Sequence, residues 1–288
     1  MSWLLLALAS AVFLGCYDLA KKKSVHENAV WPVLFLCSFI YALILLPLLF
    51  TGLCEPLSFT DHLYLMAKSA IVALSWAFTY NAIARLPLSV STSIRASAPL
   101  FTIFMAVTLM GERPAPMQWV GIIVTLGSYF CLSRAGKKEL GHFFSNGWVI
   151  SMFAGTFLAA CSGVYDKFIL QRMNFSPLTV QVWFSIYMAS IQFFIAALLW
   201  FPRRHKLPRF RFRWSFLAVA LLLILADRCY FMAVGSPEAL ISIITVLRRS
   251  SVLIGFAAGL FIFKERKSKT KVLALVGIIF GLCAIALG

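Results

Sequence analysis

The chain of 288 residues consists of long apolar runs separated by short polar segments. Hydrophobic residues make up 61% of it, far above the roughly 45–50% of soluble domains, and charged residues only 12%. A helix needs about 20 residues to cross the hydrocarbon core of a bilayer, and it satisfies its own backbone there. The sequence therefore predicts an all-α integral membrane protein with ten transmembrane helices, over residues 3–22, 30–50, 62–84, 88–111, 117–134, 147–169, 178–200, 214–235, 239–263 and 271–288.

The two halves of the sequence resemble each other. Matching residues keep their order while their offset drifts from 148 to 153 positions, which is typical of a duplicated unit with small insertions. Since five helices per unit is an odd number, the second copy enters the membrane upside down. We expect a first repeat over 1–135, a connecting loop over 136–146 and an inverted second repeat over 147–288. The matches are Gly15, Tyr17 and Asp18 with Gly163, Tyr165 and Asp166; Tyr80 and Pro87 with Tyr230 and Pro237; and Arg95, Ser97 and Glu112 with Arg248, Ser250 and Glu265.

The basic residues predict the orientation. Eighteen lysines and arginines lie in the segments after helices 1, 3, 5, 7 and 9, whereas three, Arg113, Lys167 and Arg172, lie on the other side. By the positive-inside rule the first side is cytoplasmic, so we expect both termini outside the cytoplasm of a bacterial inner (plasma) membrane. The same rule explains the net charge of +16 without a nucleic-acid partner.

Arginines occupy matching places inside the membrane in the two halves. Arg95 lies about eight residues into the fourth predicted helix, and Arg248, followed by Arg249, about ten residues into the ninth. A guanidinium in hydrocarbon costs at least about 2.5 kcal/mol, so each arginine is either neutralised by a buried carboxylate or used to bind a ligand. Its planar fork suits carboxylate and phosphate oxygens, and we expect both sides to converge on one anion.

Three aspartates are the available intramembrane carboxylates: Asp18, Asp166 and Asp227. Each is a possible coupling residue or a member of a structural ion pair. Lys21 and Lys22 lie at helical spacing from Asp18 and favour its ionised form, so we expect anion exchange or facilitated movement rather than proton coupling. Three further polar residues are expected to line the substrate site: Tyr80, Asn81 and Tyr230.

Short motifs at the end of the fourth helix and the start of the fifth carry a family resemblance. Gly111-Glu112-Arg113 closes the fourth helix, and Gln118-Trp119-Val120-Gly121 opens the fifth. With the ten-helix duplicated pattern, the chain resembles the drug/metabolite transporter superfamily, specifically its EamA-type members. The resemblance covers the whole chain and implies a secondary transporter.

A narrower resemblance concerns the arginine segments. Ile94 to Phe101, and Val246 to Arg249 with Val252 to Phe256, are similar to the phosphate-binding helices of the plastid triose-phosphate and phosphoenolpyruvate translocators. In that family a basic residue at the position of Arg95 and a basic pair at Arg248 and Arg249 hold the phosphate. This chain has arginine where the family usually has lysine at the first two positions, which changes the geometry of the contact.

The remaining residues indicate neither an enzyme nor a cofactor. The seven cysteines show no CxxC spacing, the four histidines are dispersed, and no Walker motif occurs, so we expect no metal site and no nucleotide hydrolysis. The leading hypothesis is a secondary transporter that moves a small organic anion, including phosphorylated metabolites, by alternating access at the arginines. One alternative is an EamA-type exporter of amino acids or other amphipathic metabolites; another is a lipid-modifying or accessory subunit, which the lack of a catalytic constellation disfavours. The expected partners are the small-molecule anion and membrane lipid, with the chain as a monomer or homodimer.

Overall fold

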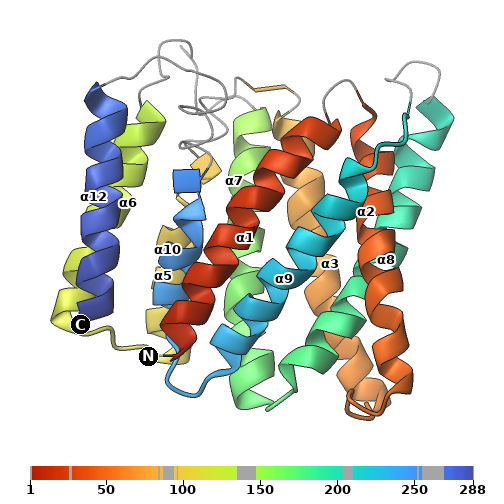
Figure 1. Ribbon diagram of the computed structural model, residues 1–288, viewed down its shortest axis with the longest axis horizontal. Coiled ribbons are helices and arrows are strands. Elements are labelled where there is room, and N and C mark those ends of the chain that lie inside the picture. Colours follow the sequence, from red (N-terminus) through yellow and green to blue (C-terminus); the bar gives the residue numbers. More distant parts are fainter. Residues whose placement is uncertain are drawn as a thin grey trace. The chain divides into compact units, whose positions relative to one another are not determined.

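The computed structural model describes residues 2–25, 28–83, 85–86, 94–95, 97–134, 147–203, 210–251, 253–254 and 269–287. Helices form ten α-helical elements within these ranges, with short 3-10 and π segments between them (Figure 1). The bounds are α1 Ser2–Val25, α2 Val30–Leu45, η1 Leu46–Phe50, α3 Phe59–Ile83, α5 Ala98–Met110, α6 Pro116–Arg134, α7 Gly147–Lys167, η2 Phe168–Arg172, α8 Pro177–Leu199, η3 Phe201–Arg203, α9 Ser215–Gly235, α10 Ile241–Arg249 and α12 Lys269–Leu287.

The all-α prediction is confirmed over the described ranges, and most helix ends fall within a few residues of the predicted ones. Five spans are long and apolar enough to cross a bilayer: Ser2–Lys21, Val30–Phe50, Gly147–Arg172, Pro177–Leu199 and Ser215–Gly235. Two shorter apolar stretches are Ala98–Met110, which is α5, and Val276–Leu287, which lies within α12. The chain is therefore an integral membrane protein. The predicted connecting loop over 136–146 and the Glu265 motif lie outside the described residues.

The helices cluster into two compact units, and each unit draws on both halves of the sequence. Unit 1 comprises Met1–Ala73 and Ile169–Pro237, and unit 2 comprises Leu74–Phe168 and Glu238–Gly288. The boundary passes through α3 and the end of α7. Each compact unit therefore combines helices from both predicted repeats.

Unit 1 is held together chiefly by α1 against α9 and α2 against α8. Phe216 and Val219 of α9 are fully buried against Tyr17 of α1 and Val33 of α2. The Ser10 hydroxyl donates to the Ala226 carbonyl at 2.7 Å, which lets the backbones of α1 and α9 approach closely.

Unit 2 contains a close pair formed by α6 and α12, which lie side by side in Figure 1. A Cβ atom on Gly121 would lie 2.6 Å from the Gly281 carbonyl oxygen, and one on Gly281 would lie 2.1 Å from the Thr125 hydroxyl. The spacing of Gly277 and Gly281 is the small-xxx-small pattern that lets membrane helices pack backbone to backbone. The same unit pairs α5 with both α7 and α10.

Candidate functional site

The helical hydrogen bonding changes beside the arginines in both halves. At these places the backbone amide bonds to the carbonyl three residues earlier, as in a 3-10 turn, instead of four residues earlier. The donors and acceptors in the first half match those in the second at the same offset of 153 that relates Arg95 to Arg248. The bonds run from Ser97 to Ile94, from Leu100 to Ser97, from Ser250 to Leu247 and from Leu253 to Ser250, at 3.0, 3.0, 3.0 and 2.8 Å.

A buried carboxylate fixes how α5 and α10 pack in unit 2. Glu112, whose side chain is 1% exposed, pairs with Lys167 at 2.7 Å and accepts hydrogen bonds from the amides of Ile241 and Ser242 at 2.6 and 3.1 Å. These amides open α10, where unpaired N–H groups and the helix dipole favour a negative charge. Lys167 also donates to the Ala239 carbonyl at 3.0 Å. One carboxylate thus joins the end of α5, the end of α7 and the start of α10.

The conformation of Gly111 brings Glu112 to this position. Gly111 has φ 69°, a left-handed conformation that favours glycine, and it ends α5 as the sequence predicts. The Glu112 amide then bonds back to the Ala106 carbonyl at 3.1 Å. The sequence motif was assigned to a helix end, but the role of its glutamate as a cap for another helix was not predicted.

This capping makes α5 and α10 antiparallel neighbours. Glu112 follows the last residue of α5 and caps the first turn of α10. Arg95 precedes α5, and Arg248 and Arg249 end α10, so all three arginines lie toward the end of the pair opposite to Glu112. Unit 2 therefore gathers the three predicted arginines at one end of one helix pair.

The exposure of these arginines differs from the expectation of burial in hydrocarbon. The side chain of Arg95 is exposed, and those of Arg248 and Arg249 are half-buried. Asp18, expected as a buried carboxylate, is also exposed on α1, whereas Asp166 on α7 is buried at 3% exposure.

The other predicted site residues are divided between the units. Asn81, near the end of α3 in unit 2, is exposed, and the side chain of Tyr80 lies outside the described residues. Tyr230 belongs to unit 1, where it is buried and packs against Phe231 with ring centroids 5.3 Å apart. The structure thus places Asn81 in the same unit as the arginines and assigns Tyr230 to the other.

Asp227 of unit 1 lies in a buried hydrogen-bond chain. Gln181 of α8 donates to the Ile224 carbonyl at 2.9 Å and to the Tyr41 hydroxyl at 3.1 Å. The Tyr41 hydroxyl lies 3.3 Å from the Asp227 carboxylate and donates to it. Because the Ile224 carbonyl can only accept, the amide nitrogen of Gln181 faces it and the amide oxygen faces away.

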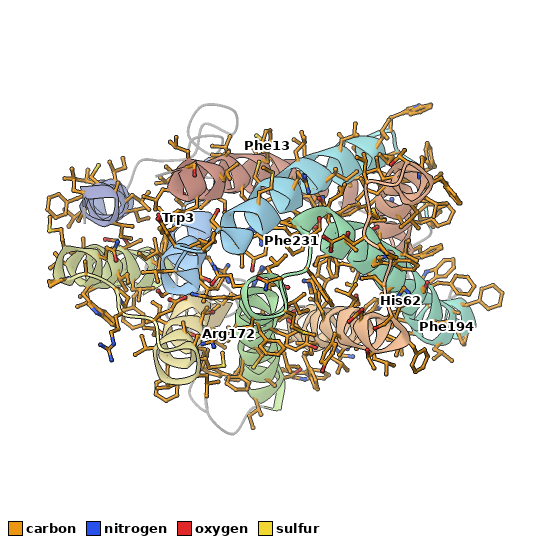
Figure 2. The ribbon with its side chains drawn as sticks, turned by 90° about the horizontal axis from the view of Figure 1, so that it is seen from below. Trp3, Phe13, His62, Arg172, Phe194 and Phe231 are labelled. Carbon is orange, nitrogen blue, oxygen red and sulfur yellow. The ribbon has the colours of Figure 1, made fainter. Side chains whose placement is uncertain are left out.

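Lys68 is a buried charged residue that the sequence analysis missed. It lies inside α3 in unit 1 with 2% exposure, and its ammonium sits 4.2 Å from the ring centroid of Phe184 and 4.9 Å from that of Phe231. Phe231, labelled in Figure 2, is itself buried at 2% exposure. Cation–π contacts of this kind contribute about 2 kcal/mol when desolvated. A lone lysine in the middle of a predicted span was the signal available in the sequence.

Comparisons with known proteins agree with this architecture. Residues 1–134 match the model of the EamA-like transporter family. Solved structures share the fold, and one, titled "Crystal structure of protein", superposes with a TM-score of 0.79 at 16% identity over 100% of this chain and 99% of its own. At that identity the likeness shows the fold alone. No curated protein matches the sequence.

Proposed function

We propose that the chain is a secondary transporter of a small organic anion, because residues 1–134 match the model of the EamA-like transporter family. The proposed site comprises Arg95, Arg248 and Arg249, and its substrates include phosphorylated metabolites. Alternating access would expose the site to one side of the membrane at a time.

The observation that carries the proposal is the matching pair of turns at the arginines. Discontinuous helices with unwound backbone near the middle of the membrane are how secondary transporters build substrate sites. Arg95 and Arg248 stand beside such turns, at one end of the antiparallel pair of α5 and α10. A structural role alone would not require that both copies keep the same turn and the same charge.

The charges of unit 2 support an anion over a cation. Among its described residues Glu112 is paired with Lys167, which leaves Asp166 as the other buried carboxylate. If Asp166 neutralises one of the arginines, positive charge still remains in excess beside the two turns. Arginine presents its donors as a fork, which matches the oxygens of carboxylate and phosphate.

Helix packing within the units supports the proposed inverted repeat. If the halves are exchanged, α1 takes the place of α7 and α9 takes the place of α3, so a contact between α1 and α9 predicts one between α7 and α3. Both contacts occur. Ser10 of α1 bonds to α9, and Ser75 of α3 donates to the Gly155 carbonyl of α7 at 2.7 Å. Three further pairs, α2 with α8, α5 with α10 and α6 with α12, map onto themselves. This is the set of contacts expected from a two-fold axis in the membrane plane.

A ligand screen tests the proposal directly. We expect phosphorylated or carboxylated metabolites to raise the melting temperature of the purified protein, because a ligand at 100 times its dissociation constant adds about 2.7 kcal/mol to stability. Arg95→Gln and Arg248→Gln should each reduce the shift, since glutamine keeps hydrogen bonding but loses the charge-assisted fork.

The matched control is Arg113→Gln, which changes an exposed arginine of the same unit. It should leave the shift intact. Full stabilisation of both site variants by the same metabolite would refute the arginine site. A response to carboxylates that lack phosphate, and to none that carry it, would favour the amino acid exporter instead.

A further inference from the structure

Unit 1 contains buried polar atoms that the proposed arginine site does not use. The Nη1 atom of Arg228 on α9 is buried and makes no hydrogen bond within the described part of the chain. The amide oxygen of Gln181 on α8 is also buried and unsatisfied there. Native proteins leave few such atoms, because each costs about 1–3 kcal/mol and more when the group is charged. A donor and an acceptor without hydrogen-bond partners in the same unit indicate a ligand that forms a hydrogen bond with each of them.

The side chains of Arg228 and Gln181 both meet one stretch of α9. The nitrogen of Gln181 donates to the Ile224 carbonyl, which points along α9 toward Arg228, one turn further on the same face. Phe231 lies three residues beyond Arg228, and the Lys68 ammonium lies 4.9 Å from its ring centroid. These side chains therefore gather along residues 224–231 of α9, a length of about 10 Å.

The charge along this stretch is positive. Lys68 and Arg228 contribute two cations, and Asp227 is the buried carboxylate of the described residues in unit 1. Asp227 already accepts a hydrogen bond from Tyr41 at 3.3 Å. One positive charge is thus in excess in a segment that spans the membrane, where uncompensated charge is costly. An anion would balance it.

We infer that unit 1 carries a second oxyanion-binding site, formed by Arg228 and Lys68 with Gln181 beside them. Arg228 Nη1 donates to a carboxylate or phosphate oxygen of the ligand, and Lys68 supplies the second positive charge. Gln181 accepts a hydrogen bond from a ligand hydroxyl, since its free oxygen cannot bind an anion. The ligand class is a hydroxylated organic anion. These three residues belong to unit 1, whereas Arg95, Arg248 and Arg249 belong to unit 2.

The test uses the full-length protein with Arg248→Gln as background, so that failure of the unit 2 site and failure of this inference are distinguishable. Glycerate, acetate and inorganic phosphate are titrated, and apparent affinity is derived from the rise of the melting temperature with concentration. In this background we expect glycerate still to stabilise the protein. Adding Arg228→Gln should weaken its apparent affinity at least about tenfold, the effect of losing a charge-assisted hydrogen bond.

Arg172→Gln is the matched control, because Arg172 is an exposed arginine of the same unit, labelled in Figure 2. It should leave the affinity unchanged. If Arg228→Gln fails to fold, Arg228→Met provides a variant of similar length that removes the unpaired guanidinium. Gln181→Leu should lower the ratio of glycerate to acetate affinity, a readout that does not depend on the stability of the variant itself.

Two results would overturn the inference. In one, none of the three anions stabilises the Arg248→Gln protein at about 100 mM, a hundred times a millimolar dissociation constant. In the other, Arg228→Gln and Arg172→Gln respond to glycerate alike. An unchanged ratio of glycerate to acetate affinity in Gln181→Leu would remove Gln181 from the site.

Discussion

Glu112 is the residue whose loss we expect to destabilise unit 2 most clearly. Its carboxylate is almost fully buried, pairs with Lys167 and caps α10 through two amides. Removing one member of a buried ion pair leaves the other charge uncompensated and costs about 3–5 kcal/mol. Glu112→Gln should therefore lower the free energy of unfolding by about 3 kcal/mol, measured by thermal denaturation in detergent.

Glu238→Gln is the control for this change, because Glu238 is exposed in the same unit. The double variant with Lys167→Met should lose less stability than the two single variants together, since it removes both charges. Strict additivity would show that the pair does not act as a unit.

The sequence identified the types of several site residues but not their environments. Arg95 and Arg248 were recognised because a charge interrupts an apolar run. Their burial was assumed from position in the run, whereas the side chain of Arg95 is exposed. Lys68 was missed because it stands alone in the first half without a repeat partner. Its burial depends on Phe184 and Phe231, which come from other helices and are far away in sequence.

Among the helical elements, α6 and α12 form the packing most sensitive to small changes. An added Cβ at Gly121 would lie 2.6 Å from a backbone oxygen of α12, which cannot move as a flexible side chain can. Gly121→Ala should force the two helices apart and destabilise the protein by about 1–3 kcal/mol. A lower melting temperature and weaker cysteine cross-linking between α6 and α12 would be the observable results.

Gly127→Ala supplies the control in the same helix, since nothing lies within 4 Å of its added Cβ. Alanine is the better helix former there, so this variant should be neutral or more stable by up to about 1 kcal/mol. Equal effects of the two substitutions would contradict close packing at Gly121.

Helix positions were predictable because apolar length dominates the signal in a membrane protein. The predicted span 30–50 matches α2 with η1, and the span 147–169 matches α7 with the start of η2. The interruptions at Ser97 and Ser250 were not predicted. Hydropathy reports which residues are apolar, and it does not distinguish a bond to the third preceding residue from one to the fourth.

At the scale of the whole molecule, orientation follows from the distribution of lysine and arginine. A reporter fused after Gly288 should lie outside the cytoplasm, and one inserted between Arg203 and Arg213 should lie inside, because the basic segments stay on the cytoplasmic side. Activity of a reporter that works only in the cytoplasm checks both positions. Labelling in the opposite sense would reverse the orientation.

Transport in proteoliposomes tests the central claim most directly. Vesicles preloaded with an unlabelled anion identified in the ligand screen should take up the labelled anion without an imposed pH gradient, because the proposed site exchanges one anion for another. Arg248→Gln should reduce this uptake at least about tenfold, whereas Arg113→Gln should retain it. Uptake by Arg248→Gln at the full rate of the unaltered protein, or uptake by the unaltered protein only when a pH gradient is imposed, would contradict anion exchange at the arginines.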